Sequence, residues 1–163
     1  MIRHLTAADF EIYRQIRLEA LREDPLAFAS YAADWQDLPD AEFSRRIAAD
    51  DVFVSFDGDD PVGIMGIMPF EPAKMTHRST IILVYLRKSH RGQGRAEALI
   101  RAVEDFARTK GLRQLELTVL TENPTAMRFY ERMGYRKIGF IPAGFLHEGR
   151  EMDEVLMMRR LTP

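Results

Sequence analysis

The chain has 163 residues, of which 46% are hydrophobic and 29% charged, proportions typical of a globular domain. Its 23 basic and 25 acidic residues give a formal net charge of -2, without the basic excess of most nucleic-acid-binding domains. It contains no cysteine, which excludes disulfides, thiolate metal sites and a cysteine nucleophile. We therefore expect a single domain, residues 1–163, that binds no nucleic acid.

The apolar runs of the sequence are short. Residues Met1 to Leu5 lack the long apolar stretch of a signal peptide, and the longest run, Ile81 to Leu86, is far too short to cross a membrane. With the absence of cysteine, these features favour a cytoplasmic protein without membrane contacts. The four histidines lack the spacing of metal ligands, so we expect no metal site.

In the first half of the chain, apolar periodicity and turn residues predict strands and helices that alternate with short loops. An apolar stripe from Ile12 to Ala20 marks the first helix, and Pro25 ends it. The expected elements are a strand over Ile2–Leu5, a helix after Thr6, a loop over Leu26–Pro39, a helix over Asp40–Asp50, and strands over Val52–Phe56 and Val62–Met68.

The second half has clearer boundaries, because glycine and proline stand where helices end and begin. The expected elements are a strand over Thr80–Leu86, a helix over Gly94–Lys110, a strand over Gln114–Leu120, a helix from Pro124 to Gly134, and strands over Tyr135–Phe140 and Val155–Arg160. A meander plus one strand–helix–strand crossover predicts an α/β fold with a mixed sheet and helices on both faces.

Two glycines, Gly92 and Gly94, lie between the buried strand and the helix that follows. Backbone N–H groups at a helix start are unpaired, and glycines leave them open to a bulky anion such as a pyrophosphate. Four basic residues add charge nearby: Arg87, Lys88, Arg91 and Arg95. The alternative is a plain turn that needs glycine for its backbone angles. The pattern is neither a P-loop nor a complete dinucleotide-binding fingerprint.

Two segments together resemble the signatures of the GNAT superfamily of acyl-CoA N-acyltransferases. Residues 91–96, RGQGRA, resemble its Gln/Arg-x-x-Gly-x-Gly/Ala turn, and residues 123–135, NPTAMRFYERMGY, resemble its Asn-x-x-Ala-x-x-Phe/Leu-Tyr motif. Two motifs in this order are far more specific than either alone. The resemblance implies a mostly antiparallel mixed sheet of about seven strands with helices on both faces, and acetyl-CoA as co-substrate.

The resemblance also assigns cofactor-binding residues. The main chain of the turn would hold the pyrophosphate, through Arg91, Gly92, Gln93, Gly94, Arg95 and Ala96. The backbone at Val84 and Leu86 would pair with the pantetheine arm, although both side chains also suit the core. Asn123 would contact the same arm, and helix capping is its other, compatible role. The chain departs from the family pattern at Lys88, where proline is common, and at Arg95, where an aliphatic residue is common.

Catalytic roles follow from the same resemblance. Tyr130 would give a proton to the departing thiolate, whereas its apolar stripe alone predicts a core tyrosine. The amine must also lose a proton, and Glu154 or His147 are the candidate bases; a solvated or salt-bridged surface residue is the alternative for Glu154. Thr118 stands where the ribosomal-protein N-terminal acetyltransferases carry Glu, which argues against that subgroup.

The acceptor is expected to be a primary amine of a small molecule or peptide, held by variable segments. One wall would carry Phe28, Tyr31 and Trp35, and the other would be the segment from Pro142 to Arg150.

Direct attack in a ternary complex is expected, because no cysteine is present and Ser89 has no evident activating partner. The alternatives are a CoA-binding sensor domain without turnover and a nucleotide-binding module. The superfamily often forms dimers, which makes a homodimer a further possibility.

Overall fold

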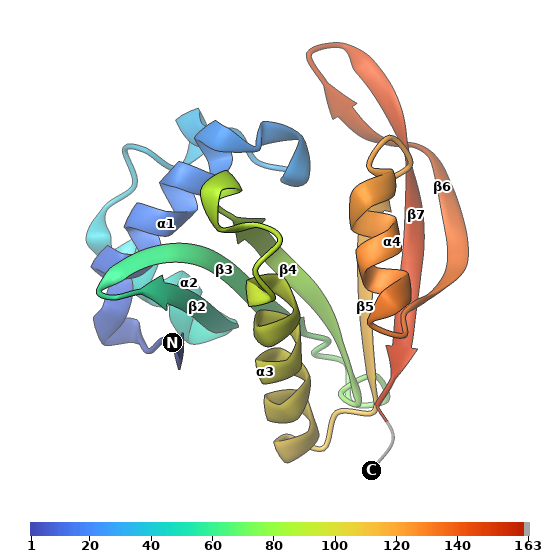
Figure 1. Ribbon diagram of the computed structural model, residues 1–163, viewed down its shortest axis with the longest axis horizontal. Coiled ribbons are helices and arrows are strands. Elements are labelled where there is room, and N and C mark those ends of the chain that lie inside the picture. Colours follow the sequence, from blue (N-terminus) through green and yellow to red (C-terminus); the bar gives the residue numbers. More distant parts are fainter. Residues whose placement is uncertain (162–163) are drawn as a thin grey trace. The chain divides into compact units, whose positions relative to one another are not determined.

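The computed structural model describes residues 1–161 as seven strands, four α-helices and four short 3₁₀ turns (Figure 1). The strands and α-helices are β1 (Ile2–His4), α1 (Phe10–Glu23), α2 (Asp40–Ala49), β2 (Asp51–Asp57), β3 (Asp60–Pro69), β4 (Arg78–Leu86), α3 (Arg95–Thr109), β5 (Gln114–Leu120), α4 (Pro124–Arg132), β6 (Arg136–His147) and β7 (Arg150–Arg160). The 3₁₀ turns are η1 (Ala7–Asp9), η2 (Pro25–Ala27), η3 (Ala32–Asp34) and η4 (Lys88–His90).

The strands form one mixed sheet in the order β1-β2-β3-β4-β5-β7-β6. β4 and β5 run parallel, whereas β1 with β2, β2 with β3, β5 with β7, and β6 with β7 pair antiparallel. The predicted element order and the mixed, mostly antiparallel sheet are therefore confirmed. The ends of the elements differ from the expected ones by one or two residues in most cases.

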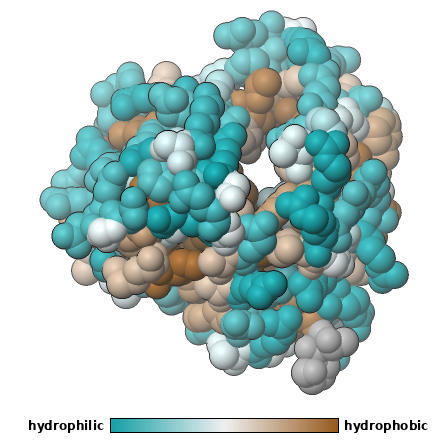
Figure 2. All heavy atoms as spheres, in the orientation of Figure 1, coloured by the Kyte–Doolittle hydropathy of each residue, from teal (hydrophilic) through white to brown (hydrophobic). Residues whose placement is uncertain are grey.

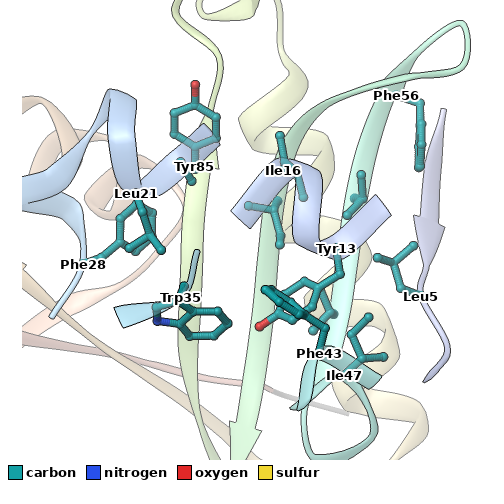
Figure 3. Close-up of a cluster of buried hydrophobic side chains, with 14 residues drawn as sticks. Leu5, Tyr13, Ile16, Leu21, Phe28, Trp35, Phe43, Ile47, Phe56 and Tyr85 are labelled. Atoms are coloured by element: carbon teal, nitrogen blue, oxygen red, sulfur yellow. The ribbon is translucent and has the colours of Figure 1, made fainter. Parts of the chain in front are cut away.

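The chain divides into two compact units, of which the first comprises Met1–Pro69 and Ile81–Phe106. Here Val52 and Val54 of β2 pack with the apolar stripes of α1 and α2 in one buried cluster (Figure 3). Phe53 points the other way, as strand alternation requires, and its ring lies 5.3 Å from that of Phe106 on α3. Helices therefore cover both faces of the strands in this unit.

The second unit comprises Phe70–Thr80 and the chain from Ala107 onward. β5 and β7 pair over seven positions, from Gln114 opposite Arg160 to Leu120 opposite Glu154. The C-terminal end of α4 is fixed by Arg159, whose Nη1 donates a hydrogen bond of 2.6 Å to the carbonyl of Met133. In this unit the end of α4 is therefore tied to β7, which pairs with β5 on one side and β6 on the other.

The β6–β7 hairpin is longer than predicted. The expected loop between Phe140 and Val155 is mostly strand, because β6 continues to His147 and β7 begins at Arg150. Glu148 and Gly149 form the turn with φ of 49° and 79°, the positive pair that suits a tight hairpin. The pairing continues past an irregularity between Ile141 and Phe145, which breaks the alternation that would have marked the strand in the sequence.

Hydrophilic residues cover most of the face in Figure 2, with brown apolar areas between them. Among residues 1–161, no helix is both long and apolar enough to span a membrane.

Candidate functional site

The glycine turn lies in the first unit, between η4 and α3. Gly92 and Gly94 both have φ of 74°, a left-handed conformation that residues with a side chain rarely adopt. A Cβ at either position would meet no atom within 4 Å, so open space faces both glycines. The carbonyl of Gly94 accepts a hydrogen bond from Ala98 N, which marks the start of α3 and its unpaired N–H groups. This backbone fits a phosphate group.

The arginines of the turn are already bound to carboxylates of the same unit. Arg91 donates from Nη2 to Asp24 at 3.1 Å, and Arg95 donates from Nη2 to Asp57 at 2.9 Å. Their remaining contacts are with carbonyl oxygens, since Arg91 Nε bonds to the carbonyl of Leu86. Both arginines thus lie beside the turn as expected, each paired with a carboxylate, and their contact with a phosphate stays a prediction.

Arg87 also forms ion pairs with carboxylates of the same unit. It donates to Glu19 at 2.8 and 2.7 Å and to Asp60 at 2.6 Å. These hydrogen bonds, first that to Glu19, raise the pKa of the Arg87 guanidinium above its ordinary value. Lys88 differs from its neighbours, because its exposed ammonium forms no ion pair or hydrogen bond with residues 1–161. It is the free cation beside the turn in the part of the chain that the structure describes.

Ser89 has a partner that the sequence analysis missed. Its Oγ lies 2.9 Å from Nδ1 of His90, and Nε2 of His90 lies 3.3 Å from Oδ2 of Asp57. Asp57 therefore holds His90 with one oxygen and Arg95 with the other. His90 follows Ser89 directly in the chain, whereas Asp57, which holds His90 in place, is 33 positions away and could not be found from the sequence. The contacts tie η4 and the start of α3 to the β2–β3 turn.

β4 leads into the glycine turn and has a backbone irregularity of its own. Leu83 has φ of 62°, which is unusual for a residue with a branched side chain inside a strand. The ladder between β4 and β5 comprises three residue pairs, from Arg78 opposite Gln114 to Thr80 opposite Glu116. Val84 is half-buried and Leu86 is buried, so both side chains contribute to packing as expected.

In the second unit, Asn123 directly precedes α4 and Tyr130 lies on it. Asn123 caps the helix, because its Oδ1 accepts a hydrogen bond of 3.0 Å from Ala126 N, and Pro124 occupies the first turn. The capping role is thereby confirmed. The amide Nδ2 of Asn123 donates to no residue among 1–161, which leaves that donor available.

Tyr130 is buried among aromatic rings, with 5% of its surface exposed. Its ring centroid lies 5.2 Å from that of Phe129 and 5.7 Å from that of Tyr135, both edge-on. Burial raises the pKa of the Tyr130 phenol well above its usual value, so the group stays protonated at neutral pH. Its hydroxyl has no hydrogen-bond partner within residues 1–161 and is not among the polar atoms sealed from solvent there.

The candidate bases lie on the β6–β7 hairpin. Glu154 is half-buried on β7, opposite Leu120 of β5 and Ile141 of β6, and forms no ion pair within residues 1–161. A Cβ added to Gly144 would lie 2.6 Å from its Oε2, so the carboxylate approaches the bulged backbone of β6 closely. His147 ends β6 instead of lying in a loop, with Nε2 4.0 Å from Glu148.

Two of the three aromatic residues expected to line the acceptor pocket lie in the core. Phe28 and Trp35 are buried, and the guanidinium carbon of Arg17 lies 4.6 and 4.5 Å from their ring centroids (Figure 3). Tyr31 is 47% exposed and does not belong to this cluster. The sequence could not distinguish these cases, because an apolar loop residue can cover a core as well as a ligand.

The first unit has an open pocket of about 480 Å³ elsewhere. Its lining residues come from α1, the end of β4 and η4, and they are Glu19, Glu23, Tyr85, Arg87, Lys88 and Ser89. Sequence analysis assigned none of them to the acceptor. Within residues 1–161, no group of three or more His, Asp and Glu side chains is arranged to hold a metal ion.

The turn and the Asn–Tyr helix both lie within one family match. Residues 14–135 match the family model described as Acetyltransferase (GNAT) family. The chain belongs to this family. Among curated relatives, N-acetyltransferase 8 of Homo sapiens is 35% identical over 48% of this chain and 35% of its own length. Streptothricin acetyltransferase of Streptomyces lavendulae is 31% identical over 69% of this chain and 57% of its own length. The matches thus span a third to little more than half of these relatives.

A solved GNAT structure has the same fold. A phosphinothricin acetyltransferase from Sinorhizobium meliloti, in complex with AcCoA, superposes with a TM-score of 0.82 and 20% identity. The superposition covers 99% of this chain and 88% of the other. At this identity the likeness establishes the GNAT fold alone.

Proposed function

We propose that this GNAT-family chain is an N-acetyltransferase that moves an acetyl group from acetyl-CoA to a primary amine of a small molecule or peptide. One observation carries the proposal. The chain combines an open glycine turn at a helix N-terminus with Tyr130, a buried and protonated phenol whose hydroxyl has no partner within residues 1–161. The named relatives, which include N-acetyltransferase 8 and streptothricin acetyltransferase, support the reaction class.

Acetyl-CoA would be held along its length. The backbone N–H groups of residues 91–96 would receive the pyrophosphate at the start of α3. The three-pair ladder between β4 and β5 leaves the backbone of Val84 and Leu86 outside that ladder, which suits pairing with the pantetheine arm. The amide Nδ2 of Asn123, which the cap does not use, would donate to the same arm.

The reaction would proceed by direct attack. The amine nitrogen forms a bond to the thioester carbonyl carbon, the carbon–sulfur bond breaks, and CoA leaves as a thiolate that takes up a proton. The raised pKa of Tyr130 favours a hydrogen bond to the developing thiolate over early loss of the phenolic proton. Glu154 would accept the proton of the amine, and its lack of an ion pair within residues 1–161 supports that role.

A homodimer is part of the proposal. β6 lies at the edge of the sheet and exposes three large apolar side chains, Ile138, Phe140 and Leu146. Unpaired edge strands with apolar side chains favour association with another chain. Light scattering should give twice the chain mass for the wild type, and the monomer mass for Phe140→Lys.

Removal of the Tyr130 hydroxyl tests the catalytic proposal. Binding of acetyl-CoA is measured by calorimetry, and release of free thiol is followed over a panel of primary amines. Tyr130→Phe should lower kcat by about 100-fold, the lower range for a general acid, with the Kd for acetyl-CoA nearly unchanged. Tyr135→Phe is the matched control, because it removes a hydroxyl from the adjacent ring.

The binding and thiol-release measurements distinguish a transferase from a sensor domain. Binding of acetyl-CoA without thiol release on any amine would indicate a sensor domain. Failure to bind any acyl-CoA would overturn the proposal altogether. Equal kcat for Tyr130→Phe and wild type would remove the acid role while leaving the transfer reaction intact.

A further inference from the structure

The pocket on the first unit carries a second inference, which rests on the proposed function and names its substrate class. Its volume of about 480 Å³ lies within the range typical of small-molecule sites. It is lined by side chains of α1, β4 and η4, and one wall is the ring of Tyr85. Figure 3 shows the hydroxyl of Tyr85 pointing away from Trp35 and Phe43, toward the end of β4.

Two charged side chains of this pocket, Glu19 and Arg87, already bind other groups of the protein. The Glu19 carboxylate accepts hydrogen bonds from Tyr85 Oη at 3.0 Å and from Arg87 at 2.8 and 2.7 Å. The hydrogen bond from Arg87 lowers the pKa of Glu19, so the carboxylate stays ionised at neutral pH. Arg87 is shared between Glu19 and Asp60, and the three groups together keep one negative charge. Glu19 also holds the hydroxyl of Tyr85, so both pocket groups already have partners within the protein.

Two other charged side chains of the pocket have no partner within residues 1–161. The side chains of Glu23, at the end of α1, and Lys88, in η4, form no ion pair or hydrogen bond with any residue among 1–161. They also do not pair with one another, although they line the same pocket. The pocket therefore presents one free carboxylate and one free ammonium group.

The two free groups select a ligand by charge. A purely cationic ligand would be attracted by Glu23 and repelled by Lys88, and a purely anionic ligand would meet the reverse. A ligand with an ammonium and a carboxylate on one carbon satisfies both. We infer that this pocket holds the α-ammonium and α-carboxylate of an amino acid, whose side-chain amine is the acetyl acceptor.

Three compounds with the same terminal amine test this inference. Lysine carries both α groups, cadaverine lacks the carboxylate, and 6-aminohexanoate lacks the α-ammonium. Lysine should have a kcat/KM at least about tenfold above each of the others, because each lost charged hydrogen bond removes a substantial part of the binding. Equal or lower kcat/KM for lysine would overturn the inference.

Two variants assign the groups. Glu23→Gln should remove the preference for lysine over 6-aminohexanoate and leave its preference over cadaverine. Lys88→Gln should do the opposite, and its Kd for acetyl-CoA is measured separately because Lys88 also lies beside the turn. Glu11→Gln, elsewhere on α1, and Lys74→Gln are the matched controls. Preferences that survive in both pocket variants would contradict the assignment.

The two proposals fail in different ways. If other amines are acetylated but lysine is not preferred over its two analogues, the pocket inference is wrong and the transferase proposal stands. If no amine at all is acetylated, the transferase proposal fails first.

Discussion

Arg95 donates a hydrogen bond from Nη2 to Oδ1 of Asp57, so the first residue of α3 is held by the turn between β2 and β3. Arg91 is held in the same way by Asp24. A phosphate at this turn would therefore find these guanidinium groups already neutralised. Its binding would depend on the backbone N–H groups behind Gly92 and Gly94.

The first prediction follows because the backbone of the turn, and not its paired arginines, would bind the phosphate. Gly94→Glu should raise the Kd for acetyl-CoA more than tenfold, because a side chain and a negative charge enter the open space at the turn. Arg95→Gln should change it less than threefold. Calorimetry measures both. Gly111→Glu is the matched control, since Gly111 has the same φ of 74° and the same open surroundings at the other end of α3. A large effect of Arg95→Gln would show that the ion pair opens for the cofactor.

The second prediction separates the two roles of Asn123. Asn123→Asp keeps the oxygen that caps α4 and removes the amide donor, whereas Asn123→Ala removes both. We expect Asn123→Ala to lower the free energy of unfolding by about 1 kcal/mol, and Asn123→Asp to leave it nearly unchanged. Both variants should weaken acetyl-CoA binding. Normal binding by Asn123→Asp would mean that the cap is the sole role of this residue.

Local features of the fold and the site could be predicted, because their causes lie within a few residues. Asn123 followed by Pro124 specified a capped helix start, and Gly94 specified the start of α3. The ion pairs could not be predicted, since Arg91 and Asp24 are 67 positions apart and meet only through the sheet. The positive φ of Leu83 also has no sequence signal, because leucine does not favour that conformation.

Arg17 gives the third prediction. It is 4% exposed, its Nε and Nη1 have no hydrogen-bond partner, and burial lowers its pKa to about 10. A buried charge without an anionic partner destabilises the folded state, although the rings of Phe28 and Trp35 offset part of this. Arg17→Met should raise the free energy of unfolding by about 1 kcal/mol, as measured by urea denaturation. Arg14→Met, at an exposed ion pair with Asp40, is the control. A loss of stability for Arg17→Met would mean that the cation–π contacts outweigh desolvation.

The fourth prediction concerns the pH dependence of stability at the β4–β5 ladder. Arg78 donates to both carboxylate oxygens of Glu116, at 2.5 and 2.9 Å, and Glu116 is 7% exposed. The hydrogen bond from Arg78 lowers the pKa of Glu116 below its ordinary value of 4.5. The unfolded chain therefore binds a proton more readily than the folded one. The pair stabilises the fold above the unfolded pKa, and this stabilisation is lost as the pH falls through the folded pKa.

Glu116→Gln should accordingly lower the free energy of unfolding at pH 7 by about 2 kcal/mol, because it leaves the half-buried Arg78 without its charged hydrogen-bond partner. The difference from wild type should shrink steadily as the pH falls below the ordinary pKa of 4.5 toward the lower pKa of Glu116 in the folded chain. Urea denaturation at several pH values measures both effects. Glu131→Gln is the control, since its ion pair with Lys137 is exposed and should matter by less than about 0.5 kcal/mol. If the difference for Glu116→Gln stays constant between pH 7 and pH 3, the ionised pair is not the source of the stabilisation, and packing of the side chain against β4 is.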